Sequence, residues 1–233
     1  MRIFHKDVTA STNLDARRGV AGDVFVAEFQ TAGRGRLDHV WHAVKGLNLT
    51  FSVVLDVGEK EPSEVATLPL VVGLAVSDAV KEVLGKSAAI KWPNDVLVGG
   101  KKVCGILCER AVNGVIAGIG VNVNQVEFPE EIRERATSIA LEVGAAVEKE
   151  KVLEAILKAL EARHVAWVRG GFGAVYADFA EVDLLKGKKV AVFQTDGDCA
   201  PVEGVCGGIQ RDGTLLVGNE FICAGEAHIK SWE

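Results

Sequence analysis

The sequence is poor in the features that mark membrane, secreted and nucleic-acid-binding proteins. Its longest near-apolar stretch, LPLVVGLAV at 68–76, contains a proline and is too short to span a bilayer. The N-terminal MRIFHKDVTAS begins polar and lacks the apolar core of a signal peptide. Acidic residues outnumber basic ones, 32 to 26, which argues against a general electrostatic grip on DNA or RNA. We therefore expect a cytoplasmic protein with no membrane anchor and no nucleic-acid partner.

Several common kinds of site are also missing. Five cysteines, an odd number at irregular spacing, argue against a disulfide framework. Cys104 and Cys108 share one face of an expected strand and fit small buried hydrophobes better than a redox pair. His39 and His42 have no third ligand nearby, which argues against zinc. We find neither a dinucleotide-binding or Walker A glycine pattern nor the elbow of a serine hydrolase.

Hydrophobic patterning predicts an α+β protein with a mostly antiparallel or mixed sheet. Ser11, Thr12 and Asn13 are good N-cap residues for a short helix that Gly19 can end. Pro62 starts a longer helix whose apolar spacing continues to Val83, and Gly85 is its expected end. Gly99-Gly100 and Asn113-Gly114 are hairpin signals between strands. The expected strands of this part are 2–8, 24–29, 47–55, 88–92, 95–98, 101–109 and 114–123.

The last part of the chain has a different character. A helical segment spans roughly 150–180 and is broken by glycines near its end. From about residue 187, short strands alternate with turn residues, which predicts a small β-barrel. We therefore expect two domains, residues 1–184 and 185–233.

The stretch QTAGRGRLDHVW (30–41) stands out because arginine alternates with glycine. Gly33 and Gly35 would let the backbone approach a ligand closely, with its amide groups exposed. Arg34 and Arg36 carry forked donors that suit carboxylate and phosphate groups. The pattern fits an anionic substrate, or two anions that must be brought together; a flexible basic hairpin is the plainer interpretation.

Three further segments could carry chemistry. The segment KWPND (91–95) lies between two expected strands, where Asn94 and Asp95 could meet a ribose, a metal or a base edge, or simply form a turn. Lys102 begins a buried strand and could point into a site or guard a sheet edge. Gly105, in mid-strand, indicates that a ligand or another backbone comes close. After Gly118 and Gly120, Asn122 and Asn124 would share one face, suited to nucleotide or metal-phosphate contacts, or simply form a polar strand end.

Taken together, STN, GRGR followed by a tryptophan, KWPND, KKVCGILCE and GIGVNVN resemble the biotin protein ligases over nearly the whole chain. The resemblance implies a catalytic domain related in fold to class II aminoacyl-tRNA synthetases, followed by a small SH3-like β-barrel. It implies that biotin and ATP are joined to biotinoyl-5′-adenylate. The biotinoyl group then passes to one lysine of a biotin carboxyl carrier protein, that of acetyl-CoA carboxylase or a related enzyme. Mg²⁺ would accompany ATP.

The same resemblance implies a role for each matching residue. The catalytic residues would be Arg34, Arg36 and Lys102, and the loop 31–42 would close over the adenylate. Trp41 would pack near the adenine, and Mg²⁺ would be bound through the phosphates, with Asn94 and Asn122 as possible further ligands. The implied biotin contacts are Ser11, Thr12, Asn13, Gln30, Gly33, Arg34, Arg36, Lys102, Gly105 and Ile106. The implied ATP contacts are Arg34, Arg36, Trp41, Asn94, Lys102 and Asn122.

The sequence departs from the family pattern in two places. Asp38 and His39 stand where the family loop often has glycine and arginine, which affects carrier docking or loop ordering more than the chemistry. The STN motif begins at residue 11, so we expect a short form without the DNA-binding domain that some relatives carry in front. Relatives often form homodimers through the sheet, and we expect the same here.

Three alternatives stay open at this point. A lipoate or octanoate protein ligase shares the adenylation logic, although those enzymes resemble R-R-x-x-G-G-G rather than GRGR. An octanoyltransferase would use a cysteine thioester, and Cys104 sits near the expected slot, but a buried thiol without a neighbouring base is usually inert. A non-catalytic biotin sensor would bind biotin without pyrophosphate chemistry.

Overall fold

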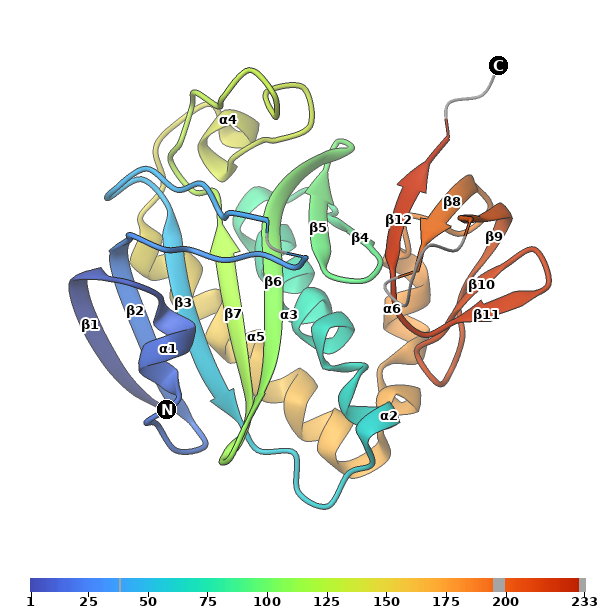
Figure 1. Cartoon of the computed structure of the whole chain (residues 1–233). Helices are drawn as coiled ribbons and strands as arrows, with labels where there is room; N and C mark the ends of the chain where they lie inside the picture. The colour runs from blue at the N-terminus through green and yellow to red at the C-terminus, as the bar shows by residue number, and fades with distance from the viewer. Residues whose placement is uncertain (38, 195–199, 231–233) are drawn as a thin grey trace.

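Seven strands form a mixed sheet in the order β1-β2-β3-β7-β6-β5-β4, which confirms the α+β prediction (Figure 1). The computed structural model describes residues 1–37, 39–194 and 200–230. The strand pair β1–β2 is parallel and all other neighbours in this sheet are antiparallel. The strands are β1 (Arg2–Thr9), β2 (Asp23–Gln30), β3 (Leu49–Leu55), β4 (Ala89–Lys91), β5 (Asp95–Val98), β6 (Lys101–Ala111) and β7 (Gly114–Val121).

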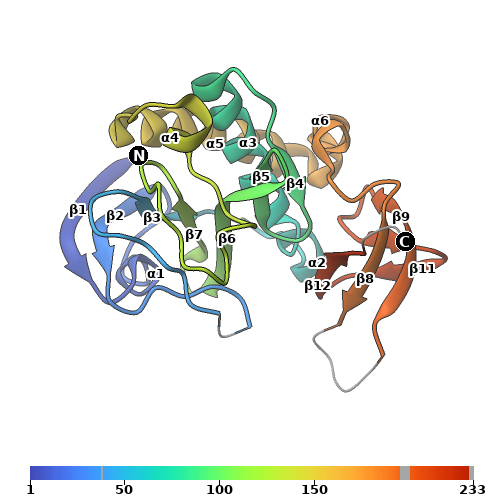
Figure 2. The same cartoon turned by 90° about the horizontal axis from the view of Figure 1, so that it is seen from above.

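Two long helices, α3 (Leu68–Leu84) and α5 (Lys149–Gly170), cover one face of this sheet (Figures 1 and 2). The predicted end of α3 is confirmed, because Gly85 is left-handed at φ 64° and its N–H donates to the Lys81 carbonyl. The helix expected to start at Pro62 is divided in two, with α2 (Pro62–Val65) preceding α3. The stretch Pro62–Leu84 is long and apolar enough to cross a membrane, but two-thirds of its most apolar window (67%) is buried in the core.

The helical segment predicted at 150–180 is broken as expected. After α5, the chain forms a short 3-10 turn, η1 (Phe172–Ala174), and then α6 (Tyr176–Val182). Gly171 between them has φ 63°, a conformation that few other residues adopt. The short helix α4 (Ile139–Val143) was not predicted, because five residues are too few to show a helical period.

The C-terminal segment forms a second sheet of five antiparallel strands in the order β11-β10-β9-β8-β12. Its strands are β8 (Lys189–Phe193), β9 (Val202–Ile209), β10 (Leu215–Val217), β11 (Glu220–Ile222) and β12 (Glu226–Ile229). The small C-terminal β-structure that the sequence predicted is therefore confirmed, with β11 and β12 at the two ends of its strand order within the described residues. Its buried side chains belong to the same apolar cluster as those of α3 and β6, so one core extends across both predicted domains.

The other face of the seven-stranded sheet is not covered by α3 and α5. The short helix α1 (Thr12–Ala16) lies there with Ser11 at its N-cap, as predicted. The segment after β2 crosses the same face in front of β7 and β6 (Figure 1). Because α3 and α5 occupy the other side, polar residues that point toward α1 and this segment meet in one place.

Candidate active site

A cavity on this open face collects residues from every motif that the sequence singled out. Its walls come from the start of α1, the end of β2 and the loop after it, Phe51 of β3, the β4–β5 hairpin, and the strands β6 and β7. One further wall residue, Glu226, comes from β12 of the C-terminal sheet. Of the residues predicted for the site, the cavity is lined by Ser11, Thr12, Asn13, Gln30, Arg34, Arg36, Trp41, Asn94, Lys102, Gly105 and Ile106.

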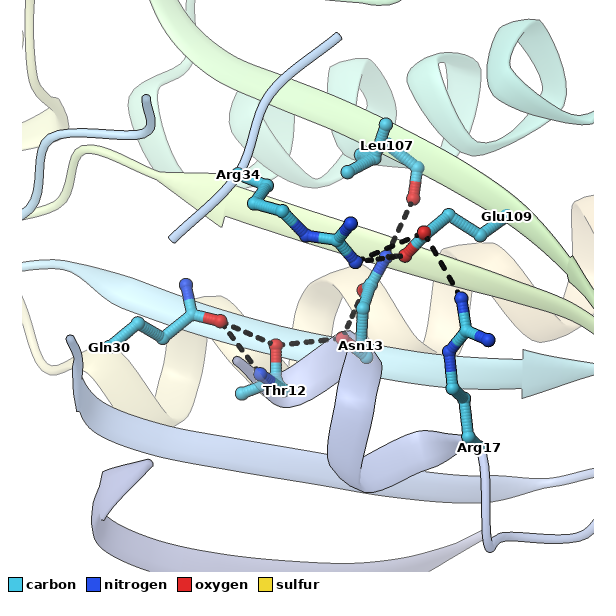
Figure 3. Close-up of polar contacts among 8 residues, drawn as sticks. Thr12, Asn13, Arg17, Gln30, Arg34, Leu107 and Glu109 are labelled. Atoms are coloured by element: carbon cyan, nitrogen blue, oxygen red, sulfur yellow. Dashed lines mark hydrogen bonds and ion pairs between the residues drawn. The ribbon is translucent and has the colours of Figure 1, made fainter. Parts of the chain in front are cut away.

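At one end of the cavity, α1 and β2 are joined by hydrogen bonds to a single amide oxygen. Gln30 Oε1 accepts from the Thr12 backbone N–H at 2.7 Å and lies 3.1 Å from the Thr12 hydroxyl (Figure 3). Ser52 Oγ, fully buried on β3, lies 2.7 Å from Thr12 Oγ1 and 2.6 Å from Asn13 Oδ1. These short polar side chains form an ordered surface of donors and acceptors, which suits a cyclic amide or urea.

The GRGR loop is a hairpin held by its own backbone. The Trp41 N–H donates to the Gly33 carbonyl at 3.1 Å, and the Gly35 N–H donates to the His39 carbonyl at 2.6 Å. A Cβ at position 33 would lie 3.1 Å from the Trp41 carbonyl oxygen, so glycine is needed here for close approach rather than for a left-handed backbone. Asp38, one of the two departures in the family pattern, lies outside the described residues.

Trp41 fills a cradle between two strand glycines. A Cβ on Gly120 would lie 2.4–2.8 Å from indole atoms of Trp41, and one on Gly105 would lie 3.0 Å from the same ring. The two glycines are register partners on β6 and β7. Their missing side chains leave room for a flat ring, and this explains the mid-strand glycine noted in the sequence. The indole Nε1 is buried and has no hydrogen-bond partner in the described chain.

The two loop arginines have different partners. Arg34 Nη2 lies 3.1 and 3.2 Å from the two carboxylate oxygens of Glu109 on β6 (Figure 3). Arg36 Nη1 donates to the Gly225 carbonyl, next to β12, at 3.1 Å. Burial lowers the pKa of the Arg36 guanidinium from its ordinary value, while the carboxylates of Glu226 and Asp95 oppose that shift. Arg36 therefore connects the loop to the C-terminal sheet and presents a half-buried cation to the cavity.

Lys102 reaches the cavity because β6 bulges next to it. In the β5–β6 ladder, Val96 pairs with Cys104 and Leu97 pairs with Lys102, so Val103 is an extra residue. The bulge brings Lys102 to the face of Gly105, and its Nζ lies 2.6 Å from Asp95 Oδ1 and 5.8 Å from the centre of the Trp41 ring.

The predicted nucleotide residues divide into two groups. Asn94 lines the cavity, and its Nδ2 donates to the Ile106 carbonyl at 2.8 Å, so the β4–β5 turn is fastened to β6. Asn122 is buried outside the cavity lining and donates to the Thr137 carbonyl at 3.0 Å. Its neighbour Asn124 bonds the backbone of Val147 instead. The structure thus brings Asn94, but not Asn122, to the site.

Four side chains of the site had no predicted role or an uncertain one. Glu109 closes the K-x-x-G-I-L-x-E motif, and its place in that motif was the only signal for it. For Asp95 the sequence left a ligand contact and a turn both open, and the structure pairs it with Lys102. Ser52 sits inside a strand that reads as continuously buried, and Glu226 belongs to a segment that showed no motif.

Comparison with known proteins identifies this arrangement. Residues 7–125 match the model of the biotin/lipoate A/B protein ligase family. The chain belongs to the biotin protein ligase family. It is 34% identical to the bifunctional ligase/repressor BirA of Bacillus subtilis, over 92% of this chain and 68% of that protein. It is 37% identical to the biotin–[acetyl-CoA-carboxylase] ligase of Mycobacterium tuberculosis, over 90% of this chain and 80% of the relative.

Solved structures of the family agree with this fold. The biotin protein ligase from Aquifex aeolicus in complex with biotin and ATP superposes with a TM-score of 0.87 at 31% identity, over 98% of both chains. The biotin protein ligase from Leishmania major in complex with biotinyl-5-AMP gives 0.69 at 27% identity, over 99% of both chains. The family fold therefore includes the C-terminal sheet as well as the seven-stranded one.

Proposed function

We propose that this chain activates biotin with ATP and transfers the biotinoyl group to a lysine of a carboxylase carrier protein. One observation carries the proposal: a single cavity has a hydrogen-bonding end, at Thr12 and Gln30, and a cationic end, at Arg36 and Lys102. Biotin has the matching shape, with a urea ring at one end and a carboxylate at the other.

In the first step, a biotin carboxylate oxygen attacks the α-phosphorus of ATP and pyrophosphate leaves. Both reactants are anions, so their approach is opposed unless cations lie between them. We assign this role to Arg36 and Lys102, which are fixed in place by Gly225 and Asp95 before any ligand arrives. Arg34 is the third cation on the cavity wall.

In the second step, the carrier lysine amine attacks the carbonyl carbon of the mixed anhydride. The bond to AMP breaks, AMP leaves and the amine loses a proton. The hairpin 33–41 covers the open face of the cavity, so we assign to it the exclusion of water from the anhydride.

Magnesium fits this site only as a companion of ATP. The described residues contain no group of three His, Cys, Asp or Glu side chains that could hold a metal ion. When bound, Mg²⁺ would neutralise polyphosphate charge, with the phosphates as its main ligands. Asn94 lies on the cavity wall and is the residue we assign to the metal–phosphate group, whereas Asn122 is buried away from it.

The partner we propose is the biotin carrier domain of acetyl-CoA carboxylase or a related carboxylase. The name of the Mycobacterium tuberculosis relative specifies acetyl-CoA carboxylase for that enzyme. We propose a cytoplasmic homodimer. The exposed edge strand β1, which carries Ile3, Phe4 and Val8 at 42–48% exposure, is consistent with pairing between two sheets.

Isotope exchange between ATP and pyrophosphate tests the first step. The purified chain is incubated with Mg²⁺ and, separately, biotin, lipoate or octanoate. We expect exchange with biotin alone, and loss of that exchange in Arg36→Ala. Exchange driven by lipoate or octanoate would assign the chain to the lipoate branch. Biotin binding with no exchange would favour a sensor.

A further inference from the structure

The Glu109 carboxylate gathers donors from two walls of the cavity. Its Oε2 accepts from Asn13 Nδ2 at 2.6 Å, and both oxygens lie within 3.2 Å of Arg34 Nη2 (Figure 3). Arg17 Nη2 lies farther off, at 3.5 Å. Asn13 belongs to α1 and Arg34 to the hairpin, so one side chain of β6 holds both segments.

Glu109 does this from a position beside the cavity, farther along β6. It follows Gly105 and Leu107 by alternation on β6, and these three residues share the face of the strand toward the site. Gly105 and Leu107 line the cavity, whereas Glu109 is not among its lining residues in the described chain. Its side chain is only 19% exposed. It therefore acts on a ligand through Asn13 and Arg34 rather than by direct contact.

The contact with Asn13 also fixes the direction of hydrogen bonds deeper in the site. Because Asn13 Nδ2 points at the carboxylate, Asn13 Oδ1 points at Ser52 and requires a donor. Ser52 has one hydroxyl hydrogen, which is thereby committed to Asn13. The oxygen of Ser52 can then only accept from Thr12.

The Thr12 hydroxyl hydrogen is the one hydrogen of this group whose direction is not fixed by these contacts. Its hydroxyl can turn toward Ser52, toward Gln30 Oε1, or toward a ligand acceptor in the cavity. A chain of polar contacts thus runs from Arg34 through Glu109, Asn13, Ser52 and Thr12 to Gln30.

We propose that Glu109 is a positioning residue, which orders the hydrogen-bonding end of the cavity and holds Arg34 beside it for an acid with a urea-like ring. The inference rests on the proposed function for the identity of that acid. Neutral glutamine at this position would present an amide N–H₂ to at least one of the converging donors, so Asn13 or Arg34 must lose its place.

Calorimetry of biotin and of ATP, each alone, tests the proposal in Glu109→Gln. We expect the Kd for biotin to rise about tenfold or more, since charge-assisted hydrogen bonds are the stronger ones. The Kd for ATP should rise clearly less than that for biotin, because Arg34 is only one of three cations on the cavity wall. The matched control is Glu142→Gln, which removes a carboxylate of similar exposure (21%) that accepts from Thr137 and Lys86. It should leave both Kd values unchanged.

Glu109→Asp separates the effect of the charge from that of the side-chain length. It keeps the charge but shortens the side chain by one methylene, so we expect a biotin Kd between those of the wild type and Glu109→Gln. Wild-type biotin affinity in Glu109→Gln, or an equal loss of biotin and ATP affinity, would overturn the proposal. If Glu109→Gln does not fold, unchanged biotin affinity in Glu109→Asp would overturn it.

Binding without ATP keeps this test separate from the ligase activity. A selective loss of biotin affinity in Glu109→Gln would support the positioning role even if the wild type showed no pyrophosphate exchange, and the missing exchange would then count against the proposed function alone.

Discussion

Lys102 shows how the chemistry of the site depends on single residues. The sequence alone does not show to which face of the sheet a lysine at the start of a strand points. Here the bulge at Val103 places Lys102 on the same face as Gly105. The partner Asp95 could not be predicted either, because KWPND is equally good turn chemistry. The two cradle glycines could be predicted as a place of close approach, but not that Trp41 fills it.

Lys102→Ala should slow adenylate formation far more than it weakens biotin binding. Its ammonium faces the place where charge develops in the reaction, and removal of one such group costs on the order of 100-fold in rate. Pre-steady-state formation of the adenylate and calorimetry with biotin measure the two effects. The exposed neighbour Lys101→Ala is the control. An equal collapse of rate and biotin affinity would make Lys102 a binding residue.

The cysteines test the thioester alternative at the same scale. Burial raises the pKa of the Cys108 thiol to about 12, and burial raises that of Cys104 further. The nucleophilic thiolate forms only as pH approaches the pKa, so both thiols stay protonated near neutral pH. In native protein at pH 8 we expect an alkylating reagent to label exposed Cys223 and to spare Cys104 and Cys108.

Peptide mass spectrometry after alkylation gives the result for each cysteine, with urea-unfolded protein as the control for full labelling. Cys104→Ser should keep its biotin-dependent exchange. Rapid native labelling of Cys104 that biotin blocks would favour the acyl-cysteine mechanism. Cys199 lies outside the described residues, and no outcome is assigned to it.

Among the helices and strands, most could be predicted from the sequence, but the breaks between helices and the order of the C-terminal strands could not. The strands 24–29 and 114–123 and the end of α3 at Gly85 are confirmed, because apolar periodicity and glycine act locally. The break between α2 and α3 and the short helix α4 left no local signal. The small C-terminal β-structure is also confirmed, but the order of its strands could not be predicted, since strand order is a long-range property.

The hairpin 33–41 yields a prediction for Gly33→Ser. The added side chain would meet the Trp41 carbonyl at 3.1 Å and Gln30 Nε2 at 3.3 Å, so the hairpin or Gln30 must shift by a few tenths of an ångström. We expect the adenylate to leak faster to free biotin and AMP, by about tenfold, with a smaller change in its formation. A chase of labelled adenylate without carrier measures the leak.

His42→Ser, an exposed substitution just past the hairpin, serves as the control for Gly33→Ser. Identical leak rates in wild type and Gly33→Ser would mean that the hairpin does not shield the anhydride.

At the scale of the whole molecule, the two sheets share one core and one site. Buried residues such as Leu215 and Ile222 of the C-terminal sheet join the cluster of α3, and Arg36 and Glu226 meet at the cavity. The sequence predicted a domain division near residue 184 but gave no reason to expect that the second part contributes to the site. Contacts across that division join segments that are distant in sequence. Such contacts cannot be predicted from hydrophobic periodicity, which is a local property.

A shared core predicts one unfolding transition. Leu215→Ala should lower the free energy of unfolding by about 2–5 kcal/mol, because Leu215 is fully buried. The described tryptophans 41, 92 and 167 all lie before the C-terminal sheet. Their fluorescence, followed in urea in a Trp232→Phe background, should therefore shift together with circular dichroism. Val112→Ala, at a fully exposed position, should change nothing. A tryptophan transition unmoved by Leu215→Ala would show that the two parts unfold independently.

We propose that one cavity both activates biotin and delivers it to a carrier lysine. A single-turnover chase tests this most directly: adenylate is formed from labelled biotin and ATP on the wild-type chain, ATP is removed, and a biotin carrier domain is added. We expect the label to appear on one carrier lysine much faster than it is lost to water. Failure to form the adenylate from biotin, or loss of label to water at the same rate with and without the carrier, would contradict it.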